Sequence, residues 1–112
     1  MTGVGDTEAA YVAAVLLQYA DLPDTPLRPS LPDQAVARRL HRDALPLPLV
    51  ESALLLGSLR RLVRAADLPP LPRIRSLAYF LPVIEELQLQ PLPDGYVDYL
   101  RLKINKLARN PA

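Results

Sequence analysis

The chain has no cysteine and no tryptophan, and its aromatic residues are five tyrosines and one phenylalanine. The absence of cysteine excludes disulfides, thiolate nucleophiles and cysteine metal ligands, and it is typical of an intracellular protein. β-Branched and aromatic residues, which favour strands, are sparse, whereas leucine and alanine, which favour helices, are abundant. The composition of these 112 residues therefore predicts a single all-α domain.

Long apolar runs are also absent. The most apolar stretch near the N-terminus, AAYVAAVLLQYA, is far shorter than the roughly 18 to 20 residues that a membrane span needs, and no basic segment precedes it. The sequence predicts a cytoplasmic protein that neither crosses nor binds a membrane.

Prolines, by contrast, are numerous: there are thirteen. Each lacks an amide donor and disfavours helix in the residue before it, so the prolines divide the chain into about five predicted helices. The prolines also predict an extended, polyproline-like strap over about 21–32 and a rigid linker over about 66–73. The first predicted helix runs from about Asp6 or Thr7, with a capping side chain at its start, to Ala20. The others are a segment capped by Ser30, about 48–65, a segment capped by Ser76, and about 96–108.

Periodicity predicts which faces of these helices are buried. The first helix is apolar nearly all round, which indicates a central helix or one buried against a second chain. The second has an inner face of Val36, Leu40 and Ala44. In the third, Gly57 indicates close approach of another group or of a neighbouring helix. Pro82 either kinks the fourth helix, which we favour, or starts it after a short turn that contains Tyr79 and Phe80.

No catalytic, metal or cofactor site is predicted. His41 lies among arginines, with no carboxylate or serine partner suggested by spacing, and is expected to be a surface histidine. Glu85 and Glu86 are adjacent, so on a helix they diverge by about 100° and cannot form a converging acid-base pair. The chain also lacks a glycine-rich phosphate loop, an H-x-x-x-H metal motif and a nucleophile elbow. We expect a non-enzymatic protein without a small-molecule substrate.

The remaining signal is the arginine content. Arginine outnumbers lysine eleven to two, and nine arginines fall between Arg28 and Arg75, flanked on both sides by acidic segments. Arginine pairs with phosphates and stacks on bases, which predicts nucleic-acid binding by faces on the second and third helices; pairing with the acidic segments is the alternative. The predicted contacts are Arg38, Arg42, Arg60, Arg61 and Arg64. A second candidate is the flank of the last helix, with Tyr99, Lys103 and Lys106.

Two stretches carry a resemblance to a known family. They are PLVESALLLGSLRRLV and IRSLAYFLPVIEEL, and they resemble helical replication-accessory modules of the DnaD and phage replisome-organiser type, as well as small proteins of bacterial mobile elements. The likeness covers about 46–87 and is carried by Ser76, Leu77, Tyr79, Phe80 and Ile84. The sequence departs from the family pattern at Pro82, which interrupts the helix, and in lacking the tryptophan that follows it. The resemblance implies an oligomerising helper of replication or transposition, with Arg73, Arg75 and Tyr79 near the DNA.

Together these observations predict an accessory subunit of a nucleoprotein complex that binds nucleic acid, DNA rather than RNA, and that has a protein partner or forms a homo-oligomer. The alternative is a protein–protein adaptor or assembly subunit that makes no nucleic-acid contact. A further motif, Pro23-x-x-Pro26-x-Arg28, resembles a ligand for SH3-type domains, although the leucines between the prolines more simply pack the strap against the helices.

Overall fold

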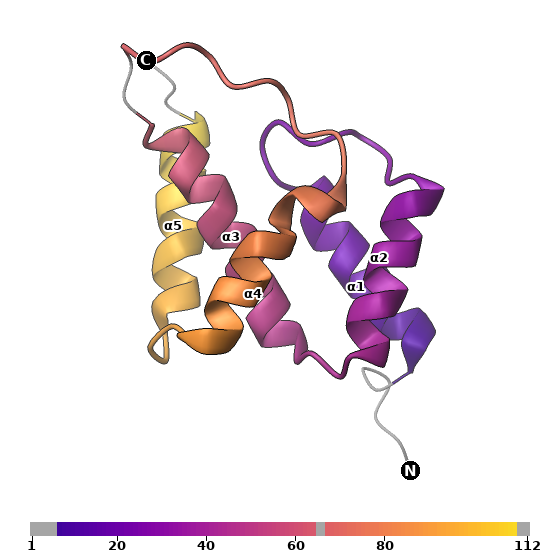
Figure 1. Cartoon of the computed structure of the whole chain (residues 1–112). Helices are drawn as coiled ribbons and strands as arrows, with labels where there is room; N and C mark the ends of the chain where they lie inside the picture. Colours follow the sequence, from indigo (N-terminus) through magenta and orange to yellow (C-terminus); the bar gives the residue numbers. More distant parts are fainter. Residues whose placement is uncertain (1–6, 65–66, 110–112) are drawn as a thin grey trace.

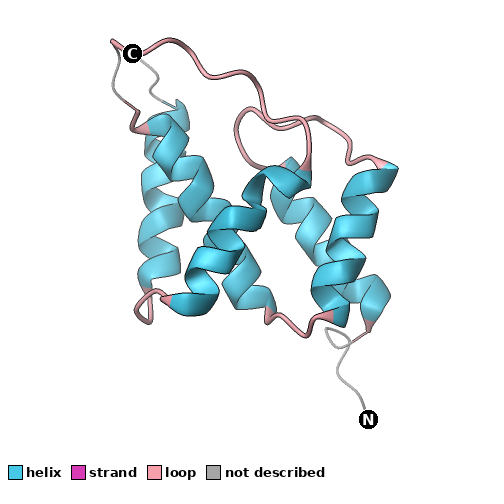
Figure 2. Ribbon diagram, in the orientation of Figure 1, coloured by secondary structure: helices cyan, strands magenta, loops and turns pink. Residues whose placement is uncertain are grey.

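The computed structural model describes residues 7–64 and 67–109. These residues form helices and loops without any strand, as Figure 2 shows. The elements are α1 (Glu8–Ala20), α2 (Leu31–Arg42), α3 (Leu47–Leu62), the 3₁₀ turn η2 (Leu77–Phe80), α4 (Leu81–Leu89) and α5 (Tyr96–Arg109). The predicted all-α fold of about five helices is confirmed. No helix among the described residues is both long and apolar enough to cross a membrane.

Helix α3 lies at the centre of the molecule and packs against α1, α4, α5 and η2 (Figure 1). Helices α1 and α2 form an antiparallel pair on one side, and α5 lies alone on the other. The first helix is therefore not the central one: it buries Tyr11, Val15 and Tyr19, while Leu17 is 73% exposed. The apolar solvent face of α1 arises because α2 and α3, its main neighbours among the described helices, cover only the opposite side of this helix.

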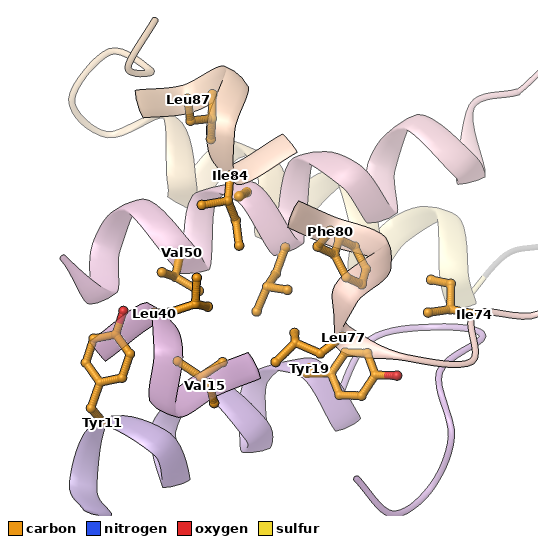
Figure 3. Packing of buried hydrophobic residues seen from close by; sticks show 13 residues of the cluster. Tyr11, Val15, Tyr19, Leu40, Val50, Ile74, Leu77, Phe80, Ile84 and Leu87 are labelled. Carbon is orange, nitrogen blue, oxygen red and sulfur yellow. The ribbon is translucent and has the colours of Figure 1, made fainter. Parts of the chain in front are cut away.

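Two apolar clusters meet on α3. The larger joins α1, α2, α3, η2 and α4, and Figure 3 shows its side chains converging from these elements. The smaller consists of Leu55, Leu100 and Ile104, between α3 and α5. Leu22, Leu56 and Leu92 pack against both clusters and link them. The fold is thus one continuous core with α5 attached at its edge.

Helix α2 begins as the sequence predicts but buries a different face. Ser30 Oγ accepts from the Asp33 N–H, and Asp33 Oδ2 accepts from the Ser30 N–H, so the two residues form a capping box. The expected inner face of Val36, Leu40 and Ala44 is wrong in part. Asp33, Ala37 and Leu40 are buried, Val36 is partly buried, and Ala44 lies beyond the helix and is exposed. The buried stripe rotates because α2 packs between α1 and η2 rather than on one partner.

The fourth helix follows the alternative that we did not favour. Ser76 makes no side-chain cap, and Leu77–Phe80 form a 3₁₀ turn before α4 starts at Leu81. Pro82 occupies the first turn of α4, where its missing N–H costs no hydrogen bond. The kinked helix is therefore wrong, although Phe80, Ile84 and Leu87 are all buried as the periodicity predicts.

The turn η2 explains the glycine in α3. A Cβ at Gly57 would lie 2.8 Å from Cδ1 of Phe80, whose ring is completely buried. Gly57 thus admits an aromatic side chain against the helix backbone, which confirms the expected close approach. The approaching group is a side chain from η2.

Candidate nucleic-acid interface

Arg60 is paired within the fold. Its two terminal nitrogens donate to the two carboxylate oxygens of Glu86 on α4, at 2.8 and 2.6 Å. The hydrogen bond raises the pKa of Arg60 and lowers the pKa of Glu86. The pair is about half exposed, so solvent screens it and its contribution to stability is small. Its geometry nevertheless leaves the guanidinium fork occupied by a carboxylate.

Arg61 is engaged more completely, and its side chain is only 9% exposed. Its guanidinium donates to the Pro72 carbonyl at 2.9 Å, to Asp24 Oδ2 at 3.3 Å and to the Tyr79 hydroxyl at 3.3 Å. It also lies over the Tyr79 ring, 5.4 Å from the centroid. Burial opposes the charge of Arg61, but these hydrogen bonds outweigh it and raise the pKa. Arg61 fastens the strap, the linker and η2 to α3.

Arg64 completes the set of predicted arginines at this end of the third helix, because it donates to the Pro69 carbonyl of the linker. The three arginines thus hold α4, the strap and the linker in place. For Arg60 and Arg61, the alternative of pairing with the acidic segments is observed directly.

The end of the linker and the residues just after it place Arg73 and Arg75 beside a groove, which is called the linker groove. Ile74 is 3% exposed and donates its N–H to the Asp24 carbonyl at 3.0 Å, whereas Arg73 and Arg75 on either side of it are exposed. Neither arginine forms an ion pair with any residue that the structure describes. Together with Tyr79, which is 44% exposed, they line a groove of about 550 Å³. The structure therefore brings Arg73, Arg75 and Tyr79 together at one groove.

Arg38 and Arg42 lie on the exposed side of α2, and neither pairs with an acid within the described part of the chain. Their helix adjoins the linker end, because Asp33 Oδ1 accepts from the Leu77 N–H at 2.9 Å. At about 100° per residue, Arg38 and Arg42 lie on the side of α2 that faces away from Asp33 and η2, so they form a surface separate from the groove.

The flank of α5 is a separate surface. Tyr99 is 49% exposed and its ring lies 5.2 Å from that of Tyr96, while Lys106 is exposed and Lys103 is partly buried. Since α5 packs on α3 and the linker groove lies beside η2, these residues do not extend the groove.

His41 lies at the end of α2, with its Nδ1 3.9 Å from a Glu8 oxygen and its ring against Tyr11 at a centroid distance of 5.1 Å. Glu8 precedes His41 by more than thirty residues, so spacing along the chain does not suggest this acidic neighbour, and only the packing of α1 on α2 brings the two together. Within the described ranges, no group of three or more histidine, aspartate or glutamate side chains could hold a metal ion.

Sequence analysis missed two acidic residues that organise this region. Asp24 accepts from Arg61 through its side chain and from Ile74 through its carbonyl, and it adopts a positive φ of 64°. Asp33 accepts from the Leu77 N–H of η2, in addition to its part in the capping box of α2. Both contacts join residues more than 35 positions apart, so no local sequence pattern indicates them.

No protein-family model matches the chain, and neither a curated protein nor a solved structure matches it.

Proposed function

We propose that the chain is a non-enzymatic accessory subunit that binds single-stranded nucleic acid along the linker groove. The observation that carries the proposal is the placement of Arg73, Arg75 and Tyr79 around one hollow. Ile74 points into the core between the two arginines, so their side chains point outward. Alternate side chains of an extended segment lie about 7 Å apart, which gives two cations along one edge of the groove.

An exposed aromatic ring beside cations suits a single strand. Successive phosphates are neutralised by arginines while an unpaired base stacks on the ring, without regard to sequence. Arg61 already covers part of Tyr79, and it holds the ring by a hydrogen bond to its hydroxyl. The platform is thus fixed before any ligand arrives, which reduces the entropy lost on binding. The resemblance of residues 46–87 to replication modules makes DNA the expected strand.

The proposal differs from the sequence-based one in the residues assigned to binding. Arg60, Arg61 and Arg64 contact other parts of the fold, so binding is assigned to Arg73, Arg75 and Tyr79, which line the groove.

The test is fluorescence anisotropy with single-stranded DNA, duplex DNA and RNA oligonucleotides across a salt series. We expect single-stranded DNA to bind most tightly, and Arg73→Ala and Arg75→Ala each to lower the salt dependence by about one phosphate contact. Tyr79→Ala weakens binding about tenfold, whereas Tyr79→Phe, which keeps the ring but loses the hydrogen bond from Arg61, weakens it less. The matched control is Arg39→Ala, because Arg39 is exposed but already lies 3.8 Å from Asp43. No binding at low salt, or equal losses in Arg39→Ala and Arg75→Ala, contradicts the proposal.

A further inference from the structure

The strap presents one side chain almost entirely to solvent. Leu27 is 94% exposed, more than any other large apolar side chain among the described residues. It lies between Pro26 and Pro29, which restrict the backbone on both sides. The strap is anchored just before it by Thr25, which is buried and donates to the Leu22 carbonyl at 2.8 Å. Leu27 is thus displayed on a stiff, fastened loop, and Arg28 beside it is exposed and has no ion pair within the described ranges.

An apolar groove of about 350 Å³ lies between the start of α3, the end of α4 and the start of α5. Its walls are mostly leucine, valine and proline, including Leu49, Leu87, Leu92 and Val97. Asp94 stands at the same groove, exposed and without an ion pair to any described residue. This groove is called the socket, and Leu27 with Arg28 the knob.

The knob and the socket match in two independent respects. Each combines an apolar part, which favours removal from water, with one unpaired charge, and the two charges are opposite. They cannot meet within one chain, because the loop between α1 and α2 and the loop between α4 and α5 lie at opposite ends of the molecule (Figure 1).

We propose that the knob of one copy docks into the socket of a second copy, with Leu27 in the groove and Arg28 paired with Asp94. This contact is head to tail, and every docked pair leaves one knob and one socket unused. Such an interface extends into a filament or closes into a ring, instead of stopping at a two-fold dimer. A single leucine knob buries less than the roughly 1,200 Å² of a stable interface, so assembly is weak and depends on concentration.

Sedimentation velocity over a concentration series, without nucleic acid, tests the proposal. We expect the wild-type protein to grow beyond a dimer, and Leu27→Asp and Asp94→Arg each to weaken association by at least tenfold. The double variant Arg28→Asp with Asp94→Arg, which exchanges the two charges, restores it. Leu102→Asp is the matched control, because Leu102 is 70% exposed but lies outside the knob and the socket. All these positions are exposed, and circular dichroism verifies that each variant folds.

A mixing experiment tests the head-to-tail geometry. Leu27→Asp keeps its socket and Asp94→Arg keeps its knob, so an equimolar mixture forms a one-to-one complex, visible by native mass spectrometry, that does not grow further. The proposal is overturned by a wild-type protein that stays monomeric, by Leu102→Asp disrupting assembly equally, or by failure of the charge exchange to restore it. None of these outcomes depends on whether the linker groove binds a nucleic acid.

Discussion

Asp33 is a carboxylate that lies 1% exposed where α2 meets η2. One of its oxygens accepts from the Ser30 N–H and the other from the Leu77 N–H, both at 2.9 Å. A single side chain therefore satisfies amide donors at the starts of two different helical turns. Because the Leu77 amide is buried and would otherwise lack a partner, the carboxylate ties η2 to the start of α2.

Replacement of Asp33 by alanine is expected to destabilise the protein by about 2–4 kcal/mol, because it removes two charge-assisted hydrogen bonds and leaves the Leu77 amide buried and unpaired. Urea unfolding followed by circular dichroism measures the change. Asp43→Ala is the control: its side chain is 57% exposed and pairs only weakly with Arg39, so a loss within about 0.5 kcal/mol is expected. Equal losses in the two variants would show that the second bond to Leu77 contributes nothing.

Two buried tyrosines differ in what their hydroxyls do. The Tyr11 hydroxyl donates to the Leu45 carbonyl at 2.7 Å, whereas the Tyr19 hydroxyl has no hydrogen-bond partner among the described residues. Tyr11→Phe is therefore expected to cost about 1 kcal/mol, and Tyr19→Phe to be neutral or stabilising. Thermal and urea unfolding of the two variants check this difference, and a larger loss in Tyr19→Phe would contradict it.

The same pair predicts how stability changes at alkaline pH. Burial raises the pKa of both phenols to about 12, from the ordinary 10, and for Tyr19 the charge of Asp33 adds to this. Since the folded state retains these protons more tightly than the unfolded chain, their contribution is complete below pH 10 and is lost as the pH rises through 12. Unfolding measured across this range should show a steep decline that is shallower in Tyr19→Phe.

Among the helices, α2 ends in an unusual way. The Leu45 N–H bonds to the Leu40 carbonyl and the Ala44 N–H to the His41 carbonyl, which is the Schellman arrangement. Its key position requires a left-handed backbone, and here an alanine adopts a φ of 58°. Glycine normally occupies this position because it has no Cβ to clash.

Replacement of Ala44 by glycine is expected to stabilise the protein by up to about 1 kcal/mol, because it relieves the left-handed strain. The control is Ala13→Gly in the exposed middle of α1, where the same substitution should cost about 1 kcal/mol. Chemical denaturation of both variants decides the matter, since opposite signs are predicted for one and the same change of side chain.

Helix boundaries that depend on neighbouring residues could be predicted from the sequence, whereas one that depends on a tertiary contact could not. The cap at Ser30 is local, and the sequence predicts it correctly, whereas the sequence leaves Asp6 and Thr7 open as starts of the first helix and the structure has Thr7 as the cap. Pro82 is compatible with both a kink and a helix start, and burial of Phe80 against Gly57 decides between them. That contact joins residues from two helices, so propensity and spacing contain no information about it.

At the scale of the whole molecule, α5 is the least connected helix. Among the described helices its main neighbour is α3, which it meets through a cluster of Leu55, Leu100 and Ile104, while the other helices share the larger core. We expect native-state hydrogen exchange to show α5 opening at a lower free energy than α1 or α3. Leu100→Ala should increase exchange in α5 far more than in α1. Uniform exchange throughout the chain would indicate a single cooperative unit instead.

The candidate site was predictable only in part for a related reason. Composition identifies arginine as the unusual residue, and the resemblance selects Arg73, Arg75 and Tyr79, which do share a groove. Which arginines are engaged elsewhere depends on tertiary neighbours. Arg61 meets Asp24, which lies 37 residues away, and no spacing rule links those positions.

Arg61 and Arg64 donate hydrogen bonds to linker carbonyls, and the balance of hydrogen-bond donors and acceptors in this chain explains why such bonds are needed. Each of its thirteen prolines adds a carbonyl acceptor without an amide donor, so proline-rich connections cannot be tied down by backbone pairing alone. An arginine brings five N–H donors, and here Pro69 and Pro72 each receive one. The arginines thus supply N–H donors that the proline-rich connections lack. Only the arginines beyond those needed to hold such connections are available to meet a phosphate.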